Sequence, residues 1–127
     1  MFEHVRTFSS YSIDDVDAAQ AFYAGKLGLE LRKNEMGFLE LQVGGGQFVN
    51  LYTKPNHEPA TFTVLNFVVT DIEKAVDELT AAGVEMEQYN IPEMKQDAKG
   101  ISRDERGPAI AWFKDPAGNV LAVLTER

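Results

Sequence analysis

The chain of 127 residues contains no cysteine. This absence excludes disulfide scaffolds and every metal site built from thiolates. Basic residues are also scarce, with 12 Lys plus Arg against 20 Asp plus Glu and a net charge of −8. Such a charge repels a phosphate backbone and an anionic membrane surface, so we expect neither nucleic acid nor a membrane as a partner.

The sequence also lacks a run of about 18 apolar residues, and its first residues do not have the basic and then apolar layout of a signal peptide. We therefore expect a cytoplasmic protein. The composition, 44% hydrophobic and 25% charged, is typical of a globular chain. A domain of this length buries a sizeable core without disulfide or metal support.

What the chain does contain is one pattern that occurs twice. Residues 8–13 (FSSYSI) and 64–69 (VLNFVV) have the β-branched and aromatic content of strands. Each segment is followed by an aspartate, Asp15 or Asp71, that suits a helix N-cap, and then by apolar residues at helical spacing. The pattern predicts a strand and then a helix at the start of each half.

Each predicted helix ends at a glycine, Gly28 or Gly83, which can take the left-handed conformation of the residue after a helix. Further strands are expected at 29–34, 37–43 and 48–53 in the first half, and at 84–86 and 120–125 in the second. Glycine-containing turns, 44–46 and 115–119, precede the two closing strands. Each half is therefore predicted to be a βαβββ module.

The predicted organisation is a single domain over residues 1–127. Module 1 spans 1–54, a linker with two prolines spans 55–60, and module 2 spans 61–127. The second module is longer by the charged stretch 90–107, which we interpret as a mobile loop or lid with few residues fit to anchor a core. Two interpretations of Arg103 and Arg106 in this stretch stay open. Either they bind an anionic group of a ligand when the loop closes, or they only keep the loop in contact with water.

Strand alternation predicts which side chains meet a ligand. In 64–69 the more apolar set, Leu65, Phe67 and Val69, is expected to face the helix, and the other set lines the concave side of the sheet. The register of the repeat and the aromatic side chains then predict a small-molecule site. Its candidate residues are Phe8, Ser10, Phe38, Asn50, Tyr52, Val64, Asn66, Trp112 and Ala122. The alternative is that these residues only fill the core.

Two segments resemble the signatures of a known family. DVDAAQAFY at 15–23 with LGLEL at 27–31, and WFKDPAGNVL at 112–121, are similar to the first-module and closing-hairpin signatures of the glyoxalase/bleomycin resistance protein/dioxygenase superfamily, also called the vicinal oxygen chelate superfamily. The resemblance covers almost the whole chain. It implies an α+β fold in which two tandem βαβββ modules form an eight-stranded curved mixed sheet around a cavity, usually in a homodimer.

The resemblance also implies where relatives hold a divalent metal ion, on the first and last strands of each module. These positions carry Phe8, Asn50, Val64 and Ala122 here. Three of the four side chains have no donor atom for a cation, so we expect neither a metal nor another cofactor. The two histidines, His4 and His57, lie outside the predicted strands and are not expected to replace the missing ligands.

These observations lead to three hypotheses about function, each from a different class of protein. The leading hypothesis is a metal-independent protein that binds a small molecule, as bleomycin resistance proteins sequester a drug. The second is an enzyme, a glyoxalase-type lyase or a ring-cleaving dioxygenase with an atypical site, in which Tyr11 or Tyr52 acts as acid or base. The third is an interaction module whose cavity is filled by its own side chains. The sequence does not decide whether the protein is catalytic.

Overall fold

The computed structural model describes residues 1–103 and 107–126. The chain divides into two compact units, Met1–Glu58 and Pro59–Arg127. The boundary between them falls inside the stretch 55–60 that the sequence predicts as a linker. Each unit contains one four-stranded mixed sheet, so the expected eight strands form two sheets of four.

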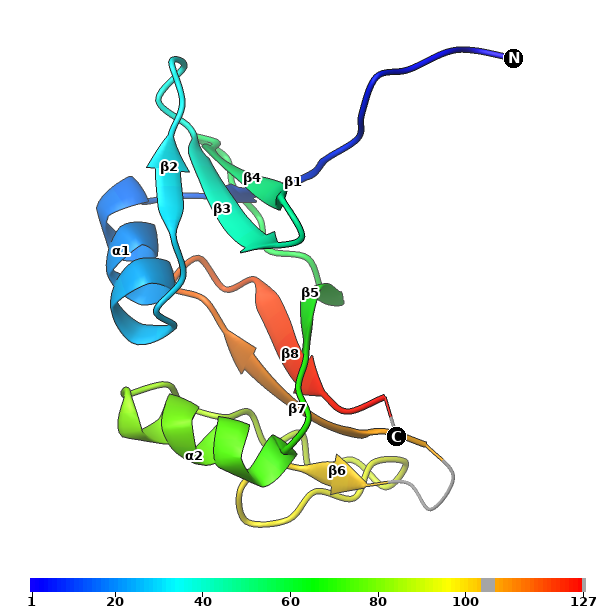
Figure 1. Cartoon of the computed structure of the whole chain (residues 1–127). Helices are drawn as coiled ribbons and strands as arrows, with labels where there is room; N and C mark the ends of the chain where they lie inside the picture. Colours follow the sequence, from blue (N-terminus) through cyan, green and yellow to red (C-terminus); the bar gives the residue numbers. More distant parts are fainter. Residues whose placement is uncertain (104–106, 127) are drawn as a thin grey trace. The chain divides into compact units, whose positions relative to one another are not determined.

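The first unit has the βαβββ order that the sequence predicts (Figure 1). Its sheet has the order β1-β4-β3-β2, in which β1 pairs in parallel with β4 and the other pairs are antiparallel. The strands are β1 (Ser9–Ile13), β2 (Leu31–Lys33), β3 (Leu39–Gly44) and β4 (Gln47–Thr53). Residues 1–8 lead into β1 as an extended segment outside the sheet.

The helix of the first unit begins where the N-cap signal predicts. Asp15 accepts a hydrogen bond from the Ala18 amide at 3.0 Å and caps α1 (Val16–Gln20). The helix continues as a wider π-helical segment, η1 (Ala21–Lys26). Gly28, with φ of 71°, follows its end in the left-handed conformation that the sequence predicts.

The second unit repeats the arrangement. Its sheet has the order β5-β8-β7-β6, again with the first and last strands parallel. Asp71 caps the helix through the Lys74 amide, and Gly83 with φ of 91° follows the helix end. The elements are β5 (Thr63–Val68), α2 (Ile72–Ala81), β6 (Ser102–Arg103), β7 (Ala109–Lys114) and β8 (Val120–Leu124).

One strand differs from the prediction. Residues 84–86 do not form a strand, and only Met86 makes an isolated bridge, to Phe113. The position next to β7 is taken instead by β6, Ser102–Arg103, which lies inside the stretch expected as a loop. The side chain of Ile101 explains this placement, because it is 1% exposed and anchors the segment in the core. The expectation that the stretch has few residues fit to anchor a core is therefore wrong in part.

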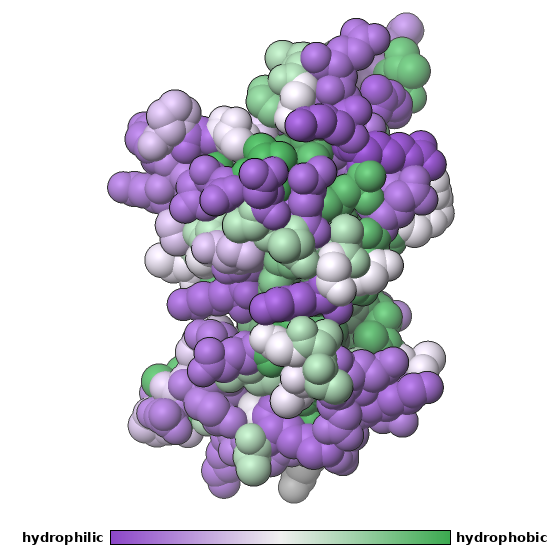
Figure 2. All heavy atoms as spheres, turned by 90° about the vertical axis from the view of Figure 1, so that its left-hand side faces the viewer, coloured by the Kyte–Doolittle hydropathy of each residue, from purple (hydrophilic) through white to green (hydrophobic). Residues whose placement is uncertain are grey.

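One face of the unit 1 sheet carries the core of that unit, whereas β8 of unit 2 is buried on both of its faces. In unit 1 the buried set alternates along the strands and includes Ile13, Leu39, Leu41, Val49 and Leu51. In unit 2 α2 packs on β7 and β8, and Phe113, Leu121 and Val123 are buried. The face seen in Figure 2 is mostly hydrophilic with small apolar patches. Within the described part of the chain, none of the helices combines the length and the apolar character that a membrane span requires.

Candidate functional site

The sheet of unit 1 has a second face, opposite the buried core, that carries polar and aromatic side chains. The register of β1, β4 and β3 aligns these side chains in rows, because residues paired across neighbouring strands point to the same side. We call this surface the polar–aromatic face. Its members are Phe8, Ser10, Ser12, Phe38, Glu40, Gln42, Phe48, Asn50 and Tyr52.

All five residues that the sequence predicts for the site in this unit lie on this face. Ser10 pairs with Asn50 across β1 and β4. The Phe38 and Tyr52 rings meet edge-on with centroids 6.1 Å apart, and Phe8 stacks on Phe48 at 4.9 Å. Asn50 and Tyr52 are half-buried, whereas Phe8 is 51% exposed.

A histidine joins this face, although no pattern in the sequence indicates it. Ser12 Oγ and His57 Nδ1 are in hydrogen-bond contact at 2.6 Å. Lys54 N–H donates to the carbonyl of Ile13, and His57 N–H donates to the carbonyl of Lys54, so the chain after β4 folds back over the end of β1. The imidazole is thereby held beside Ser12, although 45 residues separate the two in sequence.

Tyr11, one of the two tyrosines considered as an acid or base, does not belong to the face. It lies on the side of Ile13, and its hydroxyl is 2.7 Å from the hydroxyl of the buried Tyr23 in η1. Alternation along β1 necessarily places Tyr11 opposite Ser10 and Ser12. Tyr11 therefore lies on the opposite side of the sheet from the polar–aromatic face.

Three of the four residues that the sequence predicts for the site in unit 2 also lie together. Asn66 pairs with Ala122, and Ala122 pairs with Trp112, so the three form one row across β5, β8 and β7. Asn66 is exposed and Trp112 is half-buried, but Ala122 is 0% exposed. Val64, half-buried, lies beside a register irregularity between Thr63 and Leu65.

Tyr89 is a further aromatic neighbour of Trp112 that the sequence reading missed. Its ring meets the indole edge-on at a centroid distance of 5.5 Å. Burial, and then the negative charge of Glu87, raise the pKa of the Tyr89 hydroxyl, so the side chain stays neutral at physiological pH. Tyr89 N–H donates a hydrogen bond of 2.8 Å to Gln96 Oε1, and this bond fixes the backbone there.

The four positions where relatives hold a metal do not fit a divalent cation in this chain. Phe8 is engaged in its ring stack, and Val64 and Ala122 are aliphatic. Asn50 alone offers an oxygen, and a divalent ion needs several such donors. In the part of the chain that the structure describes, no three His, Asp or Glu side chains gather closely enough to hold an ion.

The charged stretch expected as a lid makes ordered contacts up to residue 103. Asp97 accepts hydrogen bonds from the amides of Lys99 and Ile101 and from the guanidinium of Arg103. Burial raises the pKa of the Asp97 carboxyl, but these hydrogen bonds lower it more, so the net pKa is below its usual value. Arg103 also binds Glu73 of α2 at 2.9 Å, and Arg106 lies outside the described residues. Movement of this segment as a lid stays a prediction.

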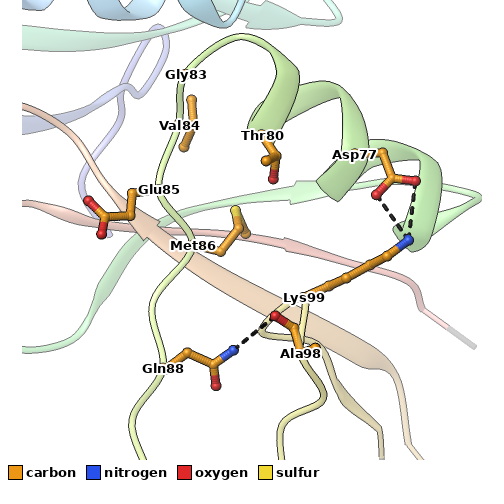
Figure 3. A pocket seen from close by; sticks show the side chains of 9 residues that line it. All are labelled: Asp77, Thr80, Gly83, Val84, Glu85, Met86, Gln88, Ala98 and Lys99. Carbon is orange, nitrogen blue, oxygen red and sulfur yellow. Dashed lines mark hydrogen bonds and ion pairs between the residues drawn. The ribbon is translucent and has the colours of Figure 1, made fainter.

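An open hollow of about 640 Å³ lies beside this network in unit 2, and none of the predicted site residues lines it (Figure 3). Lys99 extends along it to Asp77, with Nζ and Oδ1 3.0 Å apart, and also binds Glu73. These hydrogen bonds raise the pKa of Lys99. The amide NH₂ of Gln88 already donates to the carbonyls of Asp97 and Ala98. Because the ammonium group of Lys99 and the amide of Gln88 already have partners within the unit, this hollow is a poor site for an anionic ligand.

Together these observations define the class of protein, an α+β chain of two βαβββ modules with one mixed sheet each. The sequence profile of the Glyoxalase/Bleomycin resistance protein/Dioxygenase superfamily matches residues 2–123. The chain belongs to this superfamily. A search of curated protein sequences gave no match.

Solved structures with the same fold include three informative neighbours. A glyoxalase family protein from Enterococcus faecalis is 24% identical, with 98% of this chain and 99% of that chain covered and a TM-score of 0.67. TnmS3, an antibiotic-binding protein from Streptomyces sp. CB03234, is 19% identical (99% and 100% covered, TM-score 0.68). The fosfomycin resistance protein FosX from Listeria monocytogenes is 12% identical (100% and 96% covered, TM-score 0.71). At these identities the likeness establishes the fold.

Proposed function

We propose that the protein binds a small organic molecule without a metal ion, with drug sequestration as one use of such binding. The observation that carries this proposal is the chemistry of the four positions described above, where Phe8, Asn50, Val64 and Ala122 stand in place of a cation's ligands. Without a cation to polarise a substrate, the largest electrostatic contribution to a glyoxalase-type reaction is lost.

The polar–aromatic face supports the same proposal. Its aromatic rings supply contact area for a flat ligand, and the side chains of Ser10 and Asn50 supply hydrogen bonds that orient it. TnmS3, which has this fold, is an antibiotic-binding protein. We also propose a homodimer, which the resemblance to the superfamily implies and which size-exclusion chromatography with light scattering tests.

The experiment combines metal analysis with a ligand screen. Elemental analysis and native mass spectrometry of the purified protein should give no stoichiometric divalent ion. A thermal-shift screen with aromatic drugs, cationic glycopeptides and thiol conjugates should give a ligand that raises the melting temperature, and titration calorimetry should give one site per chain. A stoichiometric metal, or no stabilising ligand in a broad screen, overturns the proposal.

A metal-free enzyme is the second candidate, and one contact favours it. The imidazole of His57 beside the Ser12 hydroxyl is a general-base arrangement on the face proposed to bind the ligand. His57→Gln should abolish turnover if this candidate is correct, whereas His4→Gln should not, because His4 lies in the exposed segment before β1. Turnover that is equal in both variants excludes the imidazole from catalysis.

A further inference from the structure

The middle row of the polar–aromatic face carries a negative charge at Glu40, which lies between Asn50 on β4 and Arg32 on β2. Glu40, Asn50 and Ser10 are aligned across β3, β4 and β1 by the strand register. Glu40 is half-buried, as is Asn50. From β3 to β1, the middle row therefore carries a carboxylate, a carboxamide and a hydroxyl group.

Aromatic rings lie on both sides of this row. On one side, Phe38 lies two residues before Glu40 and Tyr52 lies two residues after Asn50, and their rings are in contact. On the other side, Phe48 lies two residues before Asn50 and stacks on Phe8. Residues i and i+2 of a strand are about 7 Å apart, so each aromatic pair is within reach of a ligand that contacts the middle row.

The carboxylate of Glu40 has no positive partner among the described residues. Its neighbour in register on β2, Arg32, instead forms an ion pair with Glu30 at 2.7 Å. The Glu40 carboxylate accepts a long hydrogen bond of 3.4 Å from the side-chain amide of Asn34. A half-buried carboxylate without a counter-ion attracts a cation more strongly than an exposed one does, because solvent screens it less.

The rings of this face already accept a planar cation within the molecule. The guanidinium of Arg6 lies over the rings of Phe8 and Phe48, 5.5 and 5.6 Å from their centroids. The pair formed by Phe38 and Tyr52, on the other side of the middle row, has no such cation in the described chain. It is therefore the pair available for a cation–π contact with a ligand.

We propose that the polar–aromatic face selects a planar organic cation, with its positive charge at Glu40 and its ring system against Tyr52 and Phe38. This inference rests on the proposed function and names the chemical class of its ligand. The net charge of −8 acts in the same direction by raising the local concentration of cations. Glu40 is then the residue that determines specificity.

The test uses three tricyclic fluorescent probes that differ mainly in charge, namely proflavine (cation), acridone (neutral) and acridine-9-carboxylate (anion). Fluorescence anisotropy with the full-length protein measures their affinities at neutral pH. Proflavine should bind about fivefold more tightly than acridone, and the anion should bind most weakly. Glu40→Gln should lower the affinity for proflavine by about fivefold and leave that for acridone within about twofold.

Glu35→Gln is the matched control, because Glu35 belongs to the same unit, is exposed and lies in the turn before β3. This variant should retain the preference for proflavine, and circular dichroism checks that both variants fold. Equal affinities for proflavine and acridone, or equal effects of the two substitutions, overturn the inference while leaving a small-molecule site in place. Failure of all three probes also overturns it, and the proposed function then fails only if the broader ligand screen is negative too.

Discussion

Ser12 and His57 are joined by a hydrogen bond of 2.6 Å between Oγ and Nδ1, although one lies on β1 and the other follows β4. The parallel pairing of β1 with β4 brings Ile13 beside Thr53, and the turn after β4 completes the approach. The contact ties the last residues of unit 1 to the polar–aromatic face.

This contact predicts a measurable coupling. Ser12→Ala and His57→Ala should each lower the free energy of unfolding by about 1 kcal/mol, and the double variant should cost less than the sum, because both remove the same hydrogen bond. Urea denaturation followed by circular dichroism measures these values. Ser9→Ala and His4→Ala, at exposed positions, are the controls. Additive costs for Ser12 and His57 would contradict the coupling.

Ile101 should behave as a core residue despite its place in a charged stretch. Because its side chain is 1% exposed, Ile101→Ala should lower the free energy of unfolding by about 2–4 kcal/mol through the cavity it leaves. Ile91→Ala is the matched control in the same stretch, since Ile91 is 44% exposed and should cost under about 0.5 kcal/mol. Equal costs for the two substitutions would show that the segment is not anchored.

Asp97 should contribute stability that depends on pH. Its pKa in the folded protein is below the unfolded value, so the carboxylate stabilises the fold above about pH 4 and this contribution is lost as the pH falls through the folded pKa. Asp97→Asn should cost about 0.5–1 kcal/mol at pH 7, a modest value because Asp97 and Arg103 are 39% and 46% exposed. The cost should shrink below pH 4 in urea titrations. Glu93→Gln, an exposed neighbour, should show no such trend.

Asp115 should be required for the turn before β8. The side chain is 5% exposed and accepts hydrogen bonds from the amides of Ala117 and Asn119 and from the side chain of Asn119. Asp115→Ala leaves these buried donors unsatisfied and should cost about 1–3 kcal/mol in urea denaturation. Asp14→Ala, an exposed aspartate at the end of β1, should leave the midpoint almost unchanged.

Metal removal should leave the protein unaffected. Dialysis against EDTA, or addition of Mn²⁺ or Zn²⁺, should move the melting temperature by no more than about 1 °C. In a protein that binds the ion, a metal concentration of a hundred times the dissociation constant would add about 2.7 kcal/mol to the free energy of unfolding. Differential scanning calorimetry measures the shift. A rise of several degrees with one equivalent of metal would contradict the assignment of Phe8, Asn50, Val64 and Ala122 to the metal positions.

The local signals in the sequence were reliable guides to the elements. Asp15 and Asp71 cap the two helices, and Gly28 and Gly83 follow their ends with positive φ. The closing strands and the turn at 44–46 also lie where glycine spacing and alternation place them. Capping, helix termination and alternation depend on residues a few positions apart, so a single sequence contains them.

The sequence pattern therefore predicts the duplicated βαβββ order. It also predicts that Ser10, Asn50 and Tyr52 lie on the face opposite the buried side chains. Packing of the whole chain buried Ile101, placed β6 at 102–103 and brought His57 to Ser12. It also decided that Arg32 pairs with Glu30 and leaves Glu40 without a counter-ion among the described residues. These outcomes depend on which distant segments share a surface, and burial and charge pairing there are settled only when the whole chain packs.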